Sequence, residues 1–216
     1  MIRNILWTKE GSPQVNLPLE KVKTVLSSPD YLIWVDIFDS KYEESLTVLK
    51  EIFGFHPLAI DDALEETHIP KIDDWDDYLC MVFQAIKFDN QQEIPVLLTQ
   101  EVDIFIGKNY ILTYREAQNE TIDKVWDRSL QNSRLYDRGC ANLLYLLLDE
   151  TASDYIVKTD QIAMVINDIE DQLFEDPDTS LLEQIFSLKR SILNLRQSIS
   201  PQREVLNKLA RGDYPI

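Results

Sequence analysis

Residues 56–86 read HPLAIDDALEETHIPKIDDWDDYLCMVFQAI and hold a helix signal followed by a strand signal. Pro57 suits the first position of a helix, where its missing N–H costs nothing, and apolar residues follow it at helical spacing. Pro70 disfavours a helical residue before it, so we expect the helix to end there. The apolar run after Tyr78 predicts a buried strand. This stretch therefore predicts a fold that mixes helices with a sheet.

The same stretch is strongly acidic, with one cation, Lys71, among its carboxylates. The acids are Asp61, Asp62, Glu65, Glu66, Asp73, Asp74, Asp76 and Asp77. Hard divalent cations such as Mg²⁺ prefer oxygen ligands, keep several waters, and are usually held by one or two carboxylates. Adjacent helical acids such as Asp61 and Asp62 project about 100° apart and can face two different neighbours. The four later acids precede a strand and are interpreted as loop charges. A solvated acidic surface stays open as the alternative.

The formal charge of −17 on 216 residues argues against nucleic acids and anionic lipids as direct partners, because such ligands need a basic surface. Cys80 and Cys140 lie in apolar runs, so we expect buried thiols and a reducing compartment. A zinc site made from these cysteines with His56 and His68 is not expected, because their spacing fits no zinc motif.

The N-terminus lacks a signal-peptide core, and the longest uncharged apolar stretch, residues 139–148, is about half of a membrane span. The chain as it stands is expected to be soluble. It lacks GxGxxG, GxxxxGK[ST], GxSxG and HExxH, so we predict no enzyme activity.

The rest of the chain divides into two parts. Strands are predicted over 31–37, 78–86, 96–107 and 109–116, with a helix over 40–53. Helices are predicted over 121–132, 138–174 and 180–209, with a kink or break at Pro201. The polar connector 175–180 predicts that the last two helices form an antiparallel hairpin with arms of about 45–55 Å. The predicted fold is α+β, an α/β sandwich: a mixed sheet flanked by helices (1–135), then a long helical hairpin (136–216).

Four segments in this order resemble the N-terminal domain of the CorA magnesium channels. They are residues 56–86, EVDIFIGKNYILTYRE (101–116), ANLLYLLLDETASDYIVKTDQI (141–162) and LKRSILNLRQSISPQREVL (188–206). No single segment is decisive, but together they cover most of the chain in register. The resemblance implies a cytoplasmic Mg²⁺-sensing domain of a homopentameric magnesium or cobalt transport channel in the cell (inner) membrane, gated by Mg²⁺ at subunit interfaces.

The family's stalk helix, two membrane spans and Gly-Met-Asn signature have no counterpart in this sequence, so we expect a fragment of a longer protein. Membrane attachment is expected only through those missing spans. By position, Asp61 and Asp62 match the family's adjacent helix acids, and Asp154 matches an acid of the first hairpin helix. These three are the predicted metal ligands, for Mg²⁺ or for Co²⁺ or another divalent cation. The family's partner aspartate lies on the stalk, so a site in this chain is expected to be incomplete and weak.

Two other functions remain open. CorA-like zinc transporters share the architecture, and the cytoplasmic domain does not reveal the transported ion. A soluble acidic module whose hairpin docks a protein partner would need no metal. A Mg²⁺-dependent change in stability that depends on Asp61 and Asp62 would separate a sensor from such a module.

Overall fold

The computed structural model describes residues 1–65, 69–89, 96–175 and 179–214. Its elements are β1 (Ile2–Thr8), β2 (Gln14–Val15), α1 (Leu19–Leu26), β3 (Tyr31–Ile37), α2 (Tyr42–Thr47), a π-helical turn η1 (Val48–Ile52), α3 (Pro57–Leu64), β4 (Lys71–Asp74), β5 (Leu79–Asp89), β6 (Val96–Ile106), β7 (Tyr110–Tyr114), α4 (Glu120–Leu130), α5 (Leu135–Glu175) and α6 (Thr179–Ala210). The predicted α+β fold is confirmed.

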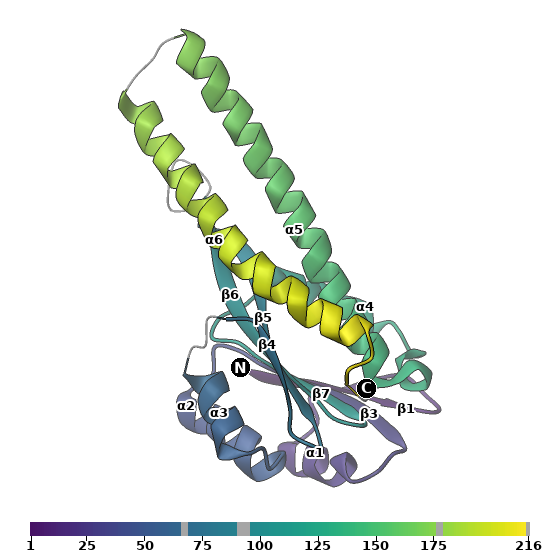
Figure 1. The fold of residues 1–216 in the computed structure, drawn as a ribbon. Helices are drawn as coiled ribbons and strands as arrows, with labels where there is room; N and C mark the ends of the chain where they lie inside the picture. The colour runs from purple at the N-terminus through teal and green to yellow at the C-terminus, as the bar shows by residue number, and fades with distance from the viewer. Residues whose placement is uncertain (66–68, 90–95, 176–178, 215–216) are drawn as a thin grey trace.

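The strands form one mixed sheet in the order β2-β1-β3-β7-β6-β5-β4. Among the described strands, β3 and β7 pair in parallel and the other neighbours pair antiparallel. Helices α1 and α3 with η1 cover one face, and α4 with the sheet-proximal parts of α5 and α6 covers the other (Figure 1). Strands buried on both faces explain the nearly continuous apolar runs of β3 and β5.

Helices α5 and α6 run antiparallel and project from the sheet as the predicted hairpin (Figure 1). Strands β5 and β6 extend beneath its lower part, where Ile86 and Leu97 share a buried cluster with apolar residues of both helices. Hydrogen bonds fix this contact: Tyr155 Oη donates to the Gln84 carbonyl oxygen (3.1 Å), and the Gln84 N–H donates to Gln202 Oε1 (2.8 Å). The sheet-proximal part of the hairpin is therefore fixed to β5 by both of its helices.

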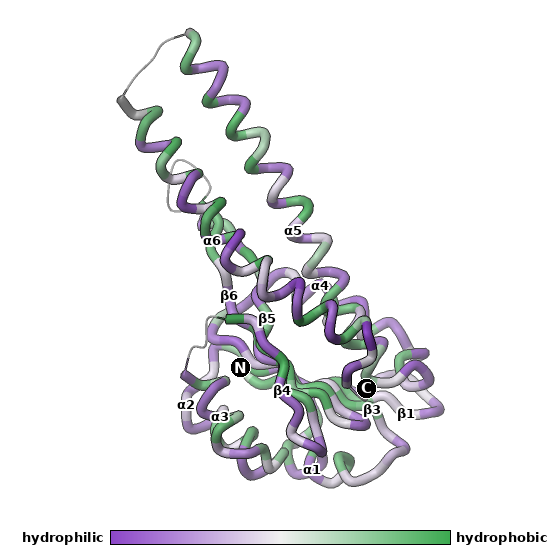
Figure 2. Tube along the Cα trace, viewed as in Figure 1, coloured by the Kyte–Doolittle hydropathy of each residue, from purple (hydrophilic) through white to green (hydrophobic). Residues whose placement is uncertain are grey.

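The hairpin carries exposed apolar side chains along both arms. Figure 2 marks the hydrophobic positions along the trace of the two helices. The exposed apolar side chains include Ile156, Val157, Met164, Leu182, Phe186 and Leu193. Among the described residues, no helix combines the length and the apolar character that a bilayer crossing demands.

A charged cluster lies inside the core. Asp36 is fully buried, receives hydrogen bonds from Thr113 Oγ1 (2.6 Å) and Arg3 Nε (2.8 Å), and pairs with Arg115, which is also buried. Both arginines also reach Asp123 on α4. The cluster joins β1, β3, the end of β7 and α4, and it balances two cations with two anions, of which Asp36 and Arg115 are fully buried.

Several sequence expectations need correction. The segment interpreted as loop charges contains β4, in which Asp73 lies opposite Cys80 of β5. The break allowed at Pro201 is wrong, because α6 continues through it. Strands β1 and β2 and helix α1 were not expected.

The burial predicted for Cys80 and Cys140 is confirmed. Next to Pro201, Gln202 fixes the helix to β5 by accepting the Gln84 N–H.

The first hairpin helix begins almost where the sequence places it. Gly139, within α5, has a φ of 68° and a ψ of −170°. This left-handed region suits glycine, and it separates a short helical turn at Leu135 from the long helix that follows.

Candidate metal site

Helix α3 holds two of the predicted ligands in place. Pro57 occupies its first turn, and His56 caps it by accepting the Leu58 N–H on Nδ1 (3.2 Å). The His56 ring also stacks on Trp75, with centroids 4.6 Å apart, which gives His56 a structural role at the start of the helix. Just before the cap, Phe55 lies 4% exposed and stacks on Phe105 of the sheet at 4.2 Å.

The buried side of α3, made by Ala59, Ile60 and Ala63, faces the sheet, so the two adjacent acids face outward. Asp61 is exposed and forms no ion pair within the described part of the chain. Asp62 is half-buried and pairs with Lys71 of β4.

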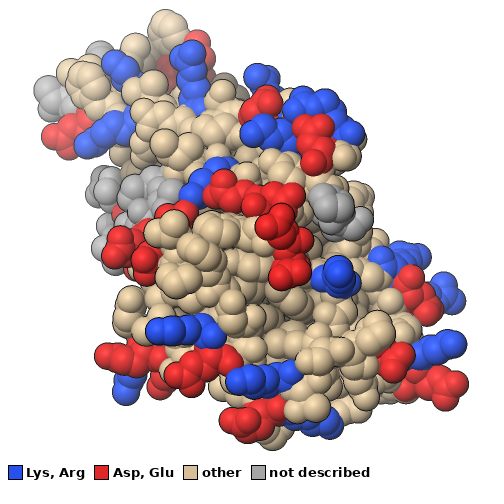
Figure 3. Space-filling view, turned by 60° about the horizontal axis from the view of Figure 1, so that its bottom comes forward, with Lys and Arg blue, Asp and Glu red and all other residues tan. Residues whose placement is uncertain are grey.

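Lys71 bridges two acids, since its Nζ also lies 3.1 Å from Asp73 Oδ2. Burial lowers the pKa of Lys71, but its hydrogen bonds to Asp62 and Asp73 outweigh that effect, and the pKa lies above its ordinary value. The ammonium therefore stays charged, and one cation is shared between two carboxylates. When the α1–α3 side is brought forward, a group of acidic side chains lies near the middle of the visible surface (Figure 3).

Asp154, the third predicted ligand, lies on α5 and is 8% exposed. Its Oδ2 accepts a hydrogen bond from Thr121 Oγ1 of α4 (2.9 Å) and pairs with Lys158 one turn along α5. Both contacts use the same oxygen. Asp154 thus already joins α4 to α5.

Within one chain the three predicted ligands are not brought together. Asp61 and Asp62 lie on α3, which covers one face of the sheet, while Asp154 lies on α5, on the other (Figure 1). Across residues 1–65, 69–89, 96–175 and 179–214, no three His, Cys, Asp or Glu side chains are arranged to hold a metal ion. A site that uses all three acids therefore needs two chains, and the three residues stay predictions.

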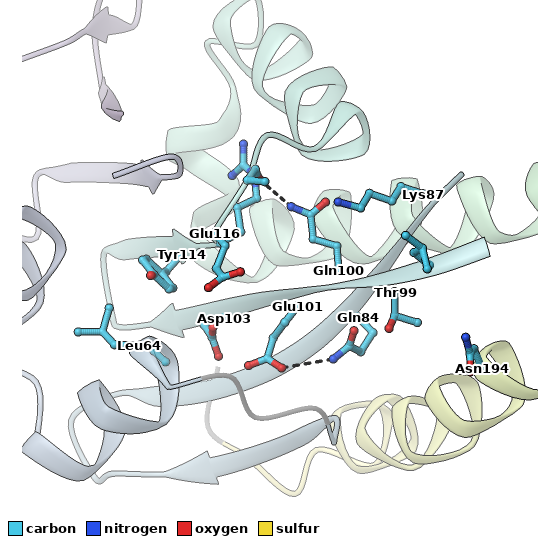
Figure 4. Close-up of a pocket in the computed structure, with 14 residues that line it drawn as sticks. Leu64, Gln84, Lys87, Thr99, Gln100, Glu101, Asp103, Tyr114, Glu116 and Asn194 are labelled. Carbon is cyan, nitrogen blue, oxygen red and sulfur yellow. Dashed lines mark hydrogen bonds between the residues drawn. The ribbon is translucent and has the colours of Figure 1, made fainter. Parts of the chain in front are cut away.

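Sequence reasoning missed a polar pocket beside the end of α3. It has a volume of about 320 Å³, and Leu64, Gln84, Glu101, Asp103 and Glu116 are among the residues that line it (Figure 4). Asp103 is 2% exposed. Burial raises the pKa of Asp103 well above its ordinary value, and the negative charges of Glu101 and Asp62 act in the same direction. A period-2 pattern in β6, Thr99, Glu101 and Asp103, was the available signal.

Comparison with known proteins agrees with this architecture. The model of a family described as "CorA-like Mg2+ transporter protein" matches residues 29–215. The cobalt/magnesium transport protein CorA of Thermotoga maritima is 29% identical over 184 residues, which cover 85% of this chain and 52% of that protein. The chain spans between about half and two thirds of the length of the curated relatives it matches.

Solved structures show the same fold. The soluble domain of CorA from Methanocaldococcus jannaschii matches with a TM-score of 0.78 at 23% identity, over 97% of this chain and 78% of that one. The cytoplasmic domain of ZntB from Vibrio parahaemolyticus matches with a TM-score of 0.66 at 12% identity, over 97% and 79% of the two chains.

Proposed function

Because the chain belongs to the family of CorA-like Mg²⁺ transporter proteins, we propose that it is the cytoplasmic, Mg²⁺-sensing domain of a divalent-cation channel. The whole protein would form a homopentamer in the cell membrane and carry Mg²⁺ or Co²⁺, with this part on the cytoplasmic side. Residues 1–135 would act as the sensing domain and 136–216 as the hairpin that leads to the stalk and spans.

The placement of Asp61 and Asp62 is the observation that carries this proposal. Packing of α3 on the sheet leaves Asp61 exposed and Asp62 partly exposed, with one shared lysine nearby. Asp154, on the other face of the sheet, would approach these acids only from a neighbouring chain. Its Oδ2 is engaged by Thr121 and Lys158, so Oδ1 is the oxygen that would turn to an ion.

The mechanism follows from charge. Two carboxylates about 4 Å apart repel by about 4 kcal/mol at an effective dielectric constant of 20, so apposed acidic surfaces separate without a counter-ion. A bound Mg²⁺ would neutralise them and favour the closed arrangement of subunits. When the ion leaves, the population shifts toward looser interfaces that permit opening.

The exposed apolar side chains of the hairpin support assembly with further protein. Ile156, Met164 and Phe186 are 63%, 64% and 57% exposed, and apolar patches of this kind mark interaction surfaces. These exposed apolar side chains therefore favour a chain that assembles with other subunits over a monomeric acidic module.

Zinc transport is the second candidate, because the fold is shared with the cytoplasmic domain of ZntB. The ligand chemistry favours Mg²⁺ for regulation. Carboxylate oxygens suit Mg²⁺, whereas zinc prefers histidine and cysteine, and both cysteines here are buried.

We expect MgCl2 at millimolar concentration to raise the melting temperature by about 2–4 °C, because an ion at about ten times its Kd stabilises the folded state measurably. In Asp61→Ala/Asp62→Ala this shift should be smaller than in wild type. Differential scanning fluorimetry at constant ionic strength measures both.

The matched control is Asp127→Ala/Asp160→Ala, which removes two exposed acids elsewhere and should keep the full shift. An equal Mg²⁺ response in wild type, the α3 variant and the control would contradict sensing through Asp61 and Asp62, as would the absence of any response.

A further inference from the structure

The pocket beside the end of α3 is walled by three neighbouring strands. Glu101 and Asp103 project from β6 on one side because they are two residues apart, and Glu116 follows β7 (Figure 4). Gln84 of β5 donates a hydrogen bond from Nε2 to Glu101 Oε2 (3.4 Å). Ala63 and Leu64 of α3 close one end. We call this cavity the Asp103 pocket.

Asp103 is the unusual residue in it. The side chain is 2% exposed, lines the cavity, and its Oδ1 has no hydrogen-bond partner. A buried carboxylate oxygen without a partner is costly, because burial removes its water and nothing replaces it. Such a group needs a proton or a positively charged ligand. Burial favours the proton when the pocket is empty, since it raises the pKa of Asp103.

The surrounding charges favour a cation. Glu101 and Asp62 act on Asp103 as negative charges, and Glu116 lines the same cavity. The basic groups nearby are largely committed elsewhere. Lys71 lies between Asp62 and Asp73, and the two terminal nitrogens of Arg115 pair with Asp36 and Asp123, whereas its buried Nε has no hydrogen-bond partner. Lys87 lines the pocket but is exposed.

The pocket is large enough for a hydrated cation. The described residues offer no three carboxylates arranged to bind one bare ion directly. A divalent ion with six waters needs roughly 200 Å³, at about 30 Å³ per water, and the cavity holds about 320 Å³. Carboxylates spaced along one strand can each accept a hydrogen bond from such a hydration shell.

We propose that the Asp103 pocket binds a hydrated divalent cation, with Mg²⁺ as the expected ion, inside a single chain. Asp103 is its principal acceptor, and Glu101 and Glu116 accept hydrogen bonds from the ion's water. None of the three predicted ligands contacts the ion in this site, although the charge of Asp62 acts on Asp103, and the site needs no second subunit.

Isothermal titration of the 216-residue chain with MgCl2 at constant ionic strength tests this site. We expect Asp103→Asn to weaken one binding event per chain by at least about tenfold, because a charge-assisted contact is lost. Asp160→Asn, the same change at an exposed position, and Asp61→Ala should both retain that event. The affinity should not depend on protein concentration.

Two further titrants define the ligand. Cobalt(III) hexammine, which cannot release its ammonia ligands, should compete with Mg²⁺ in wild type, and the organic dication putrescine should not. Binding unchanged by Asp103→Asn, or no binding in wild type, would overturn the proposal. If putrescine binds in a way that depends on Asp103 and Mg²⁺ does not bind, the ligand is an organic ammonium and the proposal of a metal ion is wrong. If cobalt(III) hexammine does not compete with Mg²⁺, the ion is not bound through an intact hydration shell, which would overturn the proposal of a hydrated ion.

The folding of the variant can be followed separately. Without divalent ions, Asp103→Asn should melt at or above the wild-type temperature at neutral pH, because a buried carboxyl is removed. The pKa of Asp103 is raised in the folded state, so the folded carboxyl keeps its proton at a pH where the unfolded one has lost it. The free energy of unfolding of wild type is therefore undiminished below about pH 4 and falls as the pH rises from there toward the folded-state pKa. The gap between the variants should therefore widen from pH 4 to 7. A difference in melting temperature that stays constant from pH 4 to 7 would contradict the assignment. A second variant, Glu101→Gln, should also bind Mg²⁺ more weakly, and unchanged Mg²⁺ binding in this variant would contradict the assignment too.

Discussion

Replacing Asp36 by alanine should lower the free energy of unfolding by about 3–5 kcal/mol, because it leaves buried cations without their counter-charge. Arg115 is fully buried, and its remaining ion pair would be the longer contact with Asp123, at 3.4 Å. Thr113 Oγ1 would lose its acceptor as well. Urea unfolding followed by circular dichroism at pH 7 measures the loss.

Two variants control for this result. Asp127→Ala removes an exposed acid of α4 and should change stability by less than about 0.5 kcal/mol. Adding Arg115→Met to Asp36→Ala should recover part of the loss, because the unpaired buried charge is then removed too. A loss below about 1 kcal/mol for Asp36→Ala would show that the cluster does not depend on this carboxylate.

Phe55→Ala should cost about 3–5 kcal/mol, the usual range for removing a buried phenylalanine. Phe55 stacks on Phe105 and contacts Phe53 and Tyr78, with centroids 5.2 and 4.7 Å away. It also precedes the cap of α3, so its loss should release the helix that carries Asp61 and Asp62. Amide hydrogen exchange across residues 57–64 should therefore accelerate more than exchange in α4.

The matched control is Tyr42→Ala, since Tyr42 is an aromatic residue that is 54% exposed, and its removal should change stability by less than about 0.5 kcal/mol. Equal protection of residues 57–64 in wild type and Phe55→Ala would contradict the anchoring role.

Elements with a strong local pattern were predictable from the sequence. The α3 boundary at Pro57 and the apolar runs of β3, β5 and β6 follow from local spacing and turn residues. β1 was missed because it is buried from Asn4 to Trp7 without alternation, and the Asn4 side chain is satisfied by the Leu17 backbone, a contact that no local pattern reveals.

β4 was missed for the opposite reason. Only Ile72 of its four residues is buried, because β4 is an edge strand and edge strands tolerate charge. A run of aspartates therefore resembled a loop. Its identity as a strand depends on pairing with β5, which the local sequence does not specify.

The candidate sites divide in the same way. Outward placement of Asp61 and Asp62 follows from helical spacing, and the family resemblance identified them. The partners of Asp154 do not follow from spacing, since Thr121 is 33 residues distant along the chain. Nor does the sequence show that Asp103 Oδ1 lacks a partner, because that depends on how three strands and α3 enclose it.

Sedimentation velocity with and without MgCl2 tests whether Mg²⁺ holds acidic surfaces of neighbouring subunits together. Millimolar MgCl2 should raise the weight-average sedimentation coefficient of the wild-type chain, and KCl at equal ionic strength should not. Asp61→Asn/Asp62→Asn should show no Mg²⁺-dependent increase. An unchanged coefficient in wild type, or the same increase in the variant or with KCl, would contradict Mg²⁺ sensing at a subunit boundary.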